Sequence, residues 1–178
     1  MTNYRRNYIQ GGYYFFTVVL NDRKSDLLIR YINELRAAFS EVKRRHPFEI
    51  IAIVVLPEHL HCILRLPEGD DDFSLRLRQV KANFSRKLPK IERISASRKK
   101  KQERGIWQRR FWEHSIRDDE GLNRHIEYIY FNPVKHELVD YVADWEYSSF
   151  HRDVKKGLFT NSWLGNGDDL IDVGEVIA

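Results

Sequence analysis

The hydrophobic positions of the chain follow two repeating patterns, and the first predicts strands. Four segments combine aromatic or β-branched residues with flanking turn residues, as strands do. These segments are Tyr13–Leu20, Phe48–Val55, His59–Leu66 and Trp107–Ile116. The short turn between the second and the third contains Pro57. We therefore expect those two strands to pair as an antiparallel hairpin.

The second pattern places apolar residues every three or four positions, which predicts helices. It covers Ser25–His46, Phe73–Leu88 and Asp118–Phe131. Ser25 or Asp26 is expected to cap the first helix. The third is expected to end before Asn132, because Pro133 disfavours helical geometry in the residue that precedes it. Lys90–Gly105 is polar, basic and poor in apolar residues, which predicts a mobile loop.

The order of these elements predicts the fold class. Strand, helix, strand, strand, helix, strand is the order of a ferredoxin-like split βαβ antiparallel sheet, an α+β fold with its helices on one face and the last helix added afterwards. The strand that begins at His59 belongs to the central pair in that arrangement. A chain of 178 residues suits one domain. We expect a catalytic domain over residues 1–156 and an acidic tail over residues 157–178.

Positive charge is concentrated in one part of the chain. Between Arg76 and Arg117 there are 15 Lys or Arg and 3 acidic residues, a local charge of +12, although the formal net charge is only +4. Such asymmetry is typical of surfaces that bind nucleic acid or acidic membranes. Aromatic residues that can stack on unpaired bases interleave with the charge, which favours nucleic acid over a merely solvated helix and loop. They are Phe84, Trp107, Phe111 and Trp112.

Composition limits the remaining choices. Cys62 is the only cysteine, so any metal must be held by nitrogen and oxygen rather than by a thiolate cluster. The apolar runs fall short of the roughly 20 residues that a membrane helix needs. The N-terminus lacks the apolar stretch of a secretory signal. A cytoplasmic protein that does not bind membranes is the resulting expectation.

Two histidines stand out in the strand that begins at His59. Side chains alternate across a sheet, so His59 and His61 project from the same face about 6.5–7 Å apart. Cys62 points to the opposite face, which favours an ion of the Mg²⁺ or Mn²⁺ type over a softer metal. A single histidine in a strand is more often structural, but two on one face raise the possibility of metal ligands.

The last predicted helix supplies a possible partner for these histidines. Tyr128 and Asn132 are four residues apart and share one helix face with His125. Taken alone, Tyr128 could be a core-edge residue and Asn132 a helix-breaking residue before proline. Together with the histidine pair, they indicate a reactive site.

The combination resembles a known family. His-hydrophobic-His followed by Tyr-Ile-Tyr-Phe-Asn-Pro-Val-Lys-His is similar to the REP-associated tyrosine transposases, which belong to the single-tyrosine HUH endonucleases. The resemblance extends to about Lys156 and includes the segments Gly-Gly-Tyr-Tyr-Phe-Phe-Thr, Trp-Gln-Arg-Arg-Phe-Trp-Glu-His and Trp-Glu-Tyr-Ser-Ser-Phe-His. One departure is Glu137, which stands where the family usually has glycine.

The resemblance implies specific roles. His59 and His61 match the metal-binding histidines, Tyr128 matches the nucleophile, and Asn132 matches the position that can complete the metal site. The implied reaction cuts single-stranded DNA beside a REP-type hairpin and leaves a 5′-phosphotyrosine that another 3′-OH can reverse. His125 or Glu127 could activate the tyrosine, and the sequence does not choose between them. A monomer and a homodimer both remain open.

The basic region supplies candidate DNA contacts. They are Lys81, Arg86, Trp107, Arg109, Arg110 and Trp112. Arg76, Arg78 and Lys87 are expected mainly to solvate their helix. The acidic tail is expected to be a solvated spacer or a weak competitor of DNA for the basic groove. The alternative functions are a non-catalytic regulator that binds structured single strands and a metal-dependent hydrolase that uses water.

Overall fold

The computed structural model describes residues 7–90, 92 and 94–165. Its strands are β1 (Tyr13–Val19), β2 (Glu49–Val55), β3 (His59–Arg65) and β4 (Trp112–Ile116). Its helices are α1 (Leu27–Arg30), α2 (Ile32–Arg45), α3 (Phe73–Lys87), α4 (Ala96–Lys100), α5 (Asp119–Lys135) and α6 (Phe150–Lys155), with a 3₁₀ turn η1 at Val142–Asp144.

The four strands form one antiparallel sheet in the order β2-β3-β1-β4. The expected α+β fold and the β2-β3 hairpin are therefore confirmed, and β3 lies in the central pair as predicted. The register aligns Thr17 of β1 with His61 of β3 and Phe16 with Cys62. Neighbouring positions alternate between the two faces of the sheet, so the register decides which side chains meet on each face.

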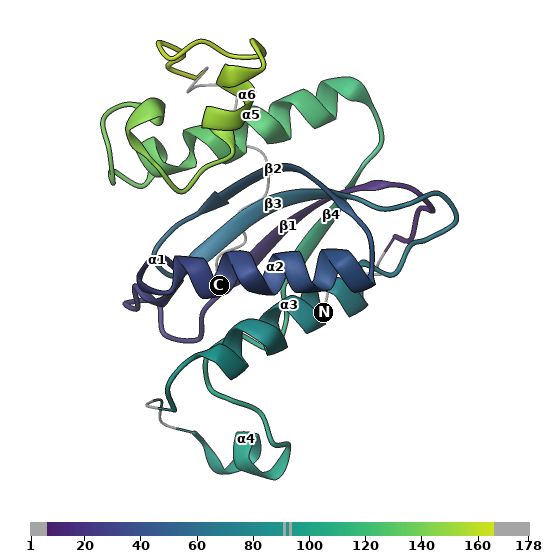
Figure 1. Cartoon of the computed structure of the whole chain (residues 1–178), viewed down its shortest axis with the longest axis vertical. Coiled ribbons are helices and arrows are strands. Elements are labelled where there is room, and N and C mark those ends of the chain that lie inside the picture. The colour runs from purple at the N-terminus through teal and green to yellow at the C-terminus, as the bar shows by residue number, and fades with distance from the viewer. Residues whose placement is uncertain (1–6, 91, 93, 166–178) are drawn as a thin grey trace, which may run out of the picture.

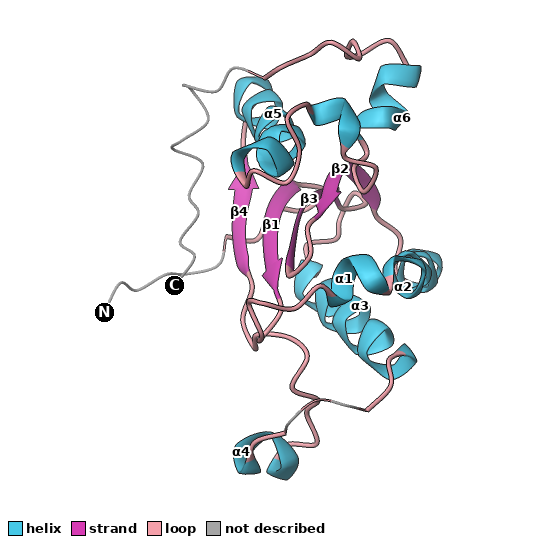
Figure 2. Ribbon diagram, turned by 90° about the vertical axis from the view of Figure 1, so that its left-hand side faces the viewer, coloured by secondary structure: helices cyan, strands magenta, loops and turns pink. Residues whose placement is uncertain are grey.

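The helices cover both faces of the sheet, which corrects the expectation that they lie on one. Helices α2 and α3 pack on the face that carries Phe16 and Cys62, whereas α5 packs on the face that carries Phe15 and Ile63. Figures 1 and 2 show α5 and α6 on one side of the sheet and α1, α2 and α3 on the other. Helix α5, the last of the predicted helices, has an apolar face of its own. It covers the face of the sheet that α2 and α3 leave open.

Several elements differ from those predicted. The first helix is divided at Tyr31, whose backbone (φ −116°, ψ 40°) leaves the helical region between α1 and α2. The last strand begins at Trp112, because Trp107 forms only an isolated bridge with Leu20. The expected loop at residues 90–105 contains α4, which is capped by the Ser95 hydroxyl.

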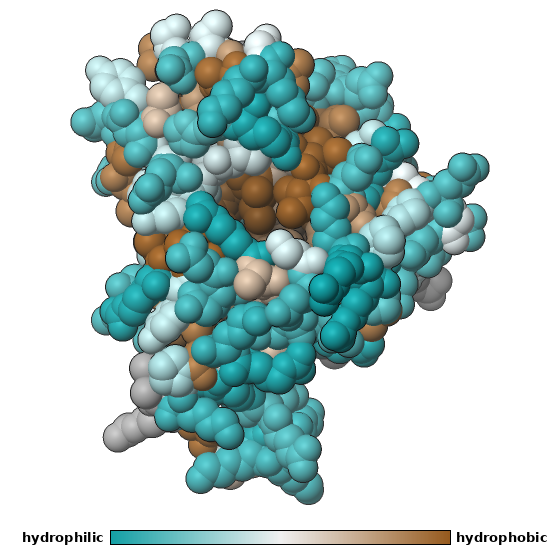
Figure 3. Space-filling model, viewed as in Figure 1, coloured by the Kyte–Doolittle hydropathy of each residue, from teal (hydrophilic) through white to brown (hydrophobic). Residues whose placement is uncertain are grey.

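The chain after α5 packs back onto the same face. Phe159 and Trp163 contact Phe150 of α6 at ring distances of 5.8 and 6.0 Å. Residues 157–165, expected to belong to an acidic tail, thus cover this apolar cluster, and residues 166–178 lie outside the described part of the chain. Figure 3 shows hydrophobic side chains in a hollow beneath this upper layer and a hydrophilic surface over α4. Among the described residues, no helix is long and apolar enough to span a bilayer.

Candidate active site and DNA-binding surface

The two histidines of β3 point into the interface between the sheet and α5. His59 and His61 are both 0% exposed, and their rings lie 4.9 Å apart. Cys62 faces the opposite core among the residues of α2 and α3. The predicted division of this strand is confirmed: nitrogen donors occupy one face and the thiol the other.

Each histidine is held by a neighbour through Nδ1. His59 Nδ1 donates to Glu58 Oε1 at 2.9 Å, and the Thr17 hydroxyl lies 2.9 Å from His61 Nδ1. Burial raises the pKa of Glu58, but the hydrogen bond and the charge interaction with His59 outweigh it and leave that pKa below its ordinary value. Contacts of this kind fix ring orientation and direct Nε2 toward a metal ion.

Helix α5 brings the tyrosine to the histidines. The Tyr128 ring lies 5.4 Å from the His61 ring, and Tyr128 is 2% exposed. Two turns later, the His136 ring lies 5.1 Å from the His59 ring. Asn132 lies halfway between these two residues on the same helix face. It is 0% exposed on that face.

The helix continues through Asn132 and Pro133, which corrects its predicted end at Phe131. Pro133 lacks an N–H and so removes one helical hydrogen bond, but the remaining turn is kept by bonds such as His136 N–H to the Asn132 carbonyl at 3.0 Å. As a result, Asn132 keeps its place one turn from Tyr128.

The buried polar atoms suit a divalent ion. His59 Nε2 and both side-chain polar atoms of Asn132 are buried without a hydrogen-bond partner in the described part of the chain. Buried polar groups are rarely left unpaired, so such atoms call for a ligand. No three His, Cys, Asp or Glu side chains there form a metal-binding group. An ion held by the two histidines would need an oxygen such as that of Asn132.

Two residues of this face escaped the sequence prediction. Lys135 Nζ lies 3.5 Å from the Tyr128 hydroxyl and 4.9 Å from the centre of its ring, and His136 contacts His59 as described above. Both follow Tyr128 at helical spacing, seven and eight positions later. This helical spacing could have predicted both residues from the sequence, but only if the helix was expected to continue past Pro133.

The two expected candidates for the base differ in their surroundings. His125 is buried against Phe15, and its Nδ1 donates to the Gly121 carbonyl at 2.6 Å. Burial lowers the pKa of His125, which favours the neutral form. Glu127 is half-buried on the same helix. His125 lies one turn before Tyr128, whereas Glu127, as the adjacent residue, points in another direction.

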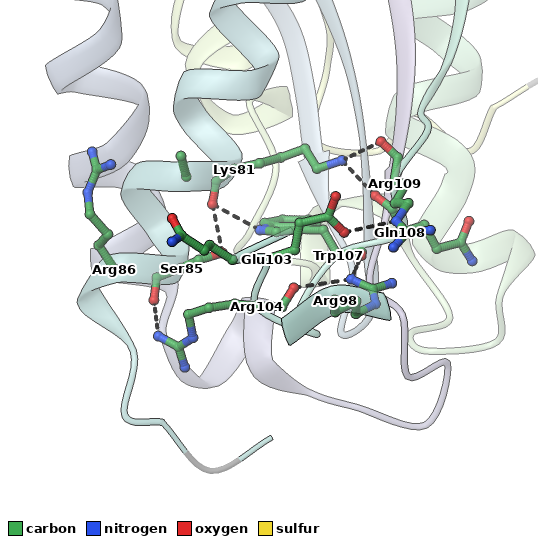
Figure 4. Close-up of a pocket in the computed structure, with 11 residues that line it drawn as sticks. Lys81, Ser85, Arg86, Arg98, Glu103, Arg104, Trp107, Gln108 and Arg109 are labelled. Atoms are coloured by element: carbon green, nitrogen blue, oxygen red, sulfur yellow. Dashed lines mark hydrogen bonds and ion pairs between the residues drawn. The ribbon is translucent and has the colours of Figure 1, made fainter. Parts of the chain in front are cut away.

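A pocket of about 450 Å³ lies between α3, α4 and the segment before β4 (Figure 4). Lys81 donates to the carbonyls of Gln108 and Arg109 at 2.6 and 3.3 Å. Burial, followed by the charge of Arg98, lowers the pKa of Lys81 to about 8. Trp107 is 6% exposed, and its Nε1 donates to the Lys81 carbonyl at 3.1 Å. Lys81 and Trp107 therefore shape the pocket wall.

The other expected DNA contacts are more accessible. Arg109 is exposed and pairs with Glu103 at 2.8 Å, and Arg110 is exposed beside it. Arg86 hydrogen-bonds Asn83 on α3. Trp112 is half-buried, and its ring stacks on that of His114 at 5.9 Å with an interplanar angle of 6°.

Two arginines hold α4 and its flanking residues 92 and 94–104, which we call the α4 arm. Arg98 donates to the carbonyls of Arg104 and Trp107, both at 3.1 Å, and to the side chain of Asn21 at 2.9 Å. Arg104 pairs with Glu92 at 2.5 Å and donates to the Leu88 carbonyl at 2.9 Å. Arg98 was expected to be part of an exposed basic run, whereas only Lys99, Lys100 and Lys101 are exposed.

A ferredoxin-like sheet that aligns two histidines beneath a helical tyrosine defines the kind of site expected for single-tyrosine nucleases. The sequence also matches the family described as "Transposase IS200 like" over residues 2–131. The chain belongs to this family of tyrosine transposases, and within it to the REP-associated group.

Three proteins similar to this chain support the assignment to that group. A REP-associated tyrosine transposase of Escherichia coli is 50% identical over 96% of this chain and 95% of its own length. A Haemophilus influenzae protein classed with the same transposases is 52% identical over 94% of this chain and 96% of its own. A REP-associated tyrosine transposase solved bound to a REP hairpin is 48% identical over the whole of both chains, with a TM-score of 0.84.

Proposed function

We propose that this transposase cleaves and rejoins single-stranded DNA beside REP-type hairpins, in a metal-dependent reaction that passes through a covalent 5′-phosphotyrosine. The observation that carries the proposal is the position of Tyr128, whose ring lies 5.4 Å from that of His61. The binding of a REP hairpin by the relative that is 48% identical supports the choice of substrate.

The side chains of His59, His61 and Asn132 would hold the divalent ion. His59 and Asn132 contribute buried atoms that lack a hydrogen-bond partner in the described residues, and Thr17 and Glu58 orient the two rings. A bound Mg²⁺ or Mn²⁺ would supply Lewis acidity at the scissile phosphate. Cys62 cannot take part, because it lies on the other face of the sheet.

The covalent step exchanges one phosphodiester for another. The Tyr128 oxygen forms a bond to phosphorus and loses its proton, while the bond from phosphorus to the 3′-oxygen breaks and that oxygen gains a proton. The products are a 5′-phosphotyrosine and a free 3′-OH. Because the phosphodiester is retained, a second 3′-OH can reverse the step without ATP. Each chain supplies one such tyrosine, so two cuts need two chains or two successive reactions.

The DNA would lie along the basic side of the molecule. Arg109 is exposed and lines the pocket in Figure 4, Arg110 is exposed next to it in the sequence, and Lys99, Lys100 and Lys101 are exposed on the α4 arm. Arg86 and Trp112 complete the proposed contacts. Lys81 and Trp107 would contribute indirectly. Lys81 hydrogen-bonds the backbone next to Arg109, and Trp107 hydrogen-bonds the Lys81 carbonyl.

The test is incubation of the protein with labelled hairpin oligonucleotides and Mn²⁺, followed by a denaturing gel. We expect a protein–DNA adduct that is lost on chelation, in Tyr128→Phe and in His59→Ala. Tyr128→Phe should bind the hairpin within a few-fold of the native protein, because the hydroxyl contributes chemistry rather than affinity. Cleavage by Tyr128→Phe would indicate a hydrolase that uses water, and binding without any cleavage by the native protein would indicate a regulator.

A further inference from the structure

The nucleophile has a cationic neighbour on its own helix. Lys135 follows Tyr128 by seven residues, which places both on one face of α5. Its Nζ donates to the Tyr128 hydroxyl at 3.5 Å and lies 4.9 Å from the ring centre. Two contacts from one ammonium thus reach the oxygen and the aromatic face of the same residue.

The exposure of the two residues differs sharply. Tyr128 is 2% exposed, whereas Lys135 is an exposed residue. The flexible lysine stem therefore connects a buried hydroxyl with the surface from which DNA must approach.

The geometry of attack brings the scissile phosphate to the same ammonium. Reacting atoms in a near-attack arrangement are about 3–3.5 Å apart. A phosphorus atom at that distance from the hydroxyl oxygen has its non-bridging oxygens within reach of a lysine that already contacts this oxygen. A charge-assisted bond to phosphate is shorter and stronger than a bond of 3.5 Å to a neutral phenol. The ammonium can therefore move from the phenol to the phosphate.

We propose that Lys135 is a catalytic residue, which holds the Tyr128 hydroxyl in the free protein and binds a non-bridging oxygen of the scissile phosphate during attack. This inference rests on the proposed cleavage by Tyr128. It assigns a task to the lysine of the Asn-Pro-Val-Lys segment, and it places a positive charge on the α5 side of the phosphate, opposite the histidines of β3. Positioned charges of this kind stabilise transition states more than ground states.

The test compares Lys135→Met and Lys135→Arg with the native protein in single-turnover adduct formation at saturating hairpin. We expect Lys135→Met to slow the step by about 100-fold, the usual effect of removing one stabilising donor. Its hairpin affinity should stay within about three-fold. Lys135→Arg should recover most of the lost rate, because it keeps the charge. The control is Lys43→Met, which removes an exposed lysine of α2 on the other face of the sheet.

Chemical rescue separates a catalytic from a structural role. Propylammonium added to Lys135→Ala should raise its rate, whereas tetramethylammonium, which lacks an N–H donor, should not. A Lys135→Met rate equal to or above the native rate would overturn the inference, as would a rescue by both cations. Absence of a Tyr128-dependent adduct in the native protein would instead overturn the proposed function.

Discussion

The hydroxyl of Thr17 lies 2.9 Å from Nδ1 of His61, within an aligned pair that joins β1 and β3. The contact connects the two central strands at the position where the candidate metal ligands face α5. When Thr17 accepts this bond, His61 carries its proton on Nδ1 and keeps the lone pair of Nε2 for a metal ion.

Replacement of Thr17 should therefore weaken metal use without weakening DNA binding. In Thr17→Val, which keeps the shape of the side chain but loses the hydroxyl, we expect the Mn²⁺ concentration for half-maximal cleavage to rise about 10–100-fold. Thr17→Ser should behave like the native protein. A metal titration of adduct formation measures the effect, and an unchanged Thr17→Val curve would show that the hydroxyl does not orient His61.

Asn132 is expected to lower the free energy of unfolding of the metal-free protein while being required for cleavage. Its buried amide lacks hydrogen-bond partners among the described residues, and an unpaired buried polar group costs about 1–3 kcal/mol. Asn132→Leu should raise the free energy of unfolding of the chelator-treated protein by about 1 kcal/mol while abolishing cleavage. Urea denaturation with and without Mn²⁺ provides the measurement. A clear loss of stability in the metal-free state would mean that the amide has a structural role.

The exposed lysines of the α4 arm should control the salt dependence of DNA binding. Each phosphate contact adds a slope of roughly −0.7 to the logarithmic salt dependence on single strands. Replacing Lys99, Lys100 and Lys101 by alanine should reduce the slope by about 2. The matched control replaces the exposed triplet Lys43, Arg44 and Arg45 at the end of α2. Equal effects of the two triplets would indicate a general charge effect.

Glu137 should be a site of strain. Its φ of 56° lies in the left-handed region, where a side chain is unfavourable and glycine is not. Glu137→Gly should raise the free energy of unfolding by about 0.5–1 kcal/mol and leave cleavage unchanged. Asp140→Gly, also exposed but outside this backbone region, should have the opposite effect on thermal unfolding.

The sequence predicted the sheet and one half of the candidate site for a physical reason. Strands impose a period of two, so the placement of His59 and His61 opposite Cys62 needed no knowledge of the rest of the fold. Lys135 and His136 were missed because Pro133 was interpreted as the end of the helix. A helix that packs on a sheet can tolerate the loss of one backbone hydrogen bond, and local sequence does not reveal that compensation.

Arginines were the least predictable residues. Arg76 was expected to solvate its helix, yet it is 2% exposed, pairs with Asp70 at 2.6 Å and donates to the Pro47 carbonyl at 2.8 Å. Arg98 and Arg104 likewise bind backbone carbonyls of the residues around the α4 arm. Such bonds depend on which backbone carbonyls have no hydrogen bond within a helix or strand of the folded chain. The periodic pattern of apolar residues does not predict these carbonyls.

The sheet also confines the candidate reactive residues to one of its two faces. Apolar core lies on both faces, but only the face that packs against α5 carries Tyr128 and the histidines. A substitution as small as Tyr128→Phe removes a single oxygen atom from that face and leaves the other untouched. In evolutionary terms, a copy of the gene that loses catalysis in this way would still encode a folded protein with its basic surface intact. Under the proposed mechanism, one oxygen atom therefore separates an enzyme that cuts DNA from a protein that only binds it.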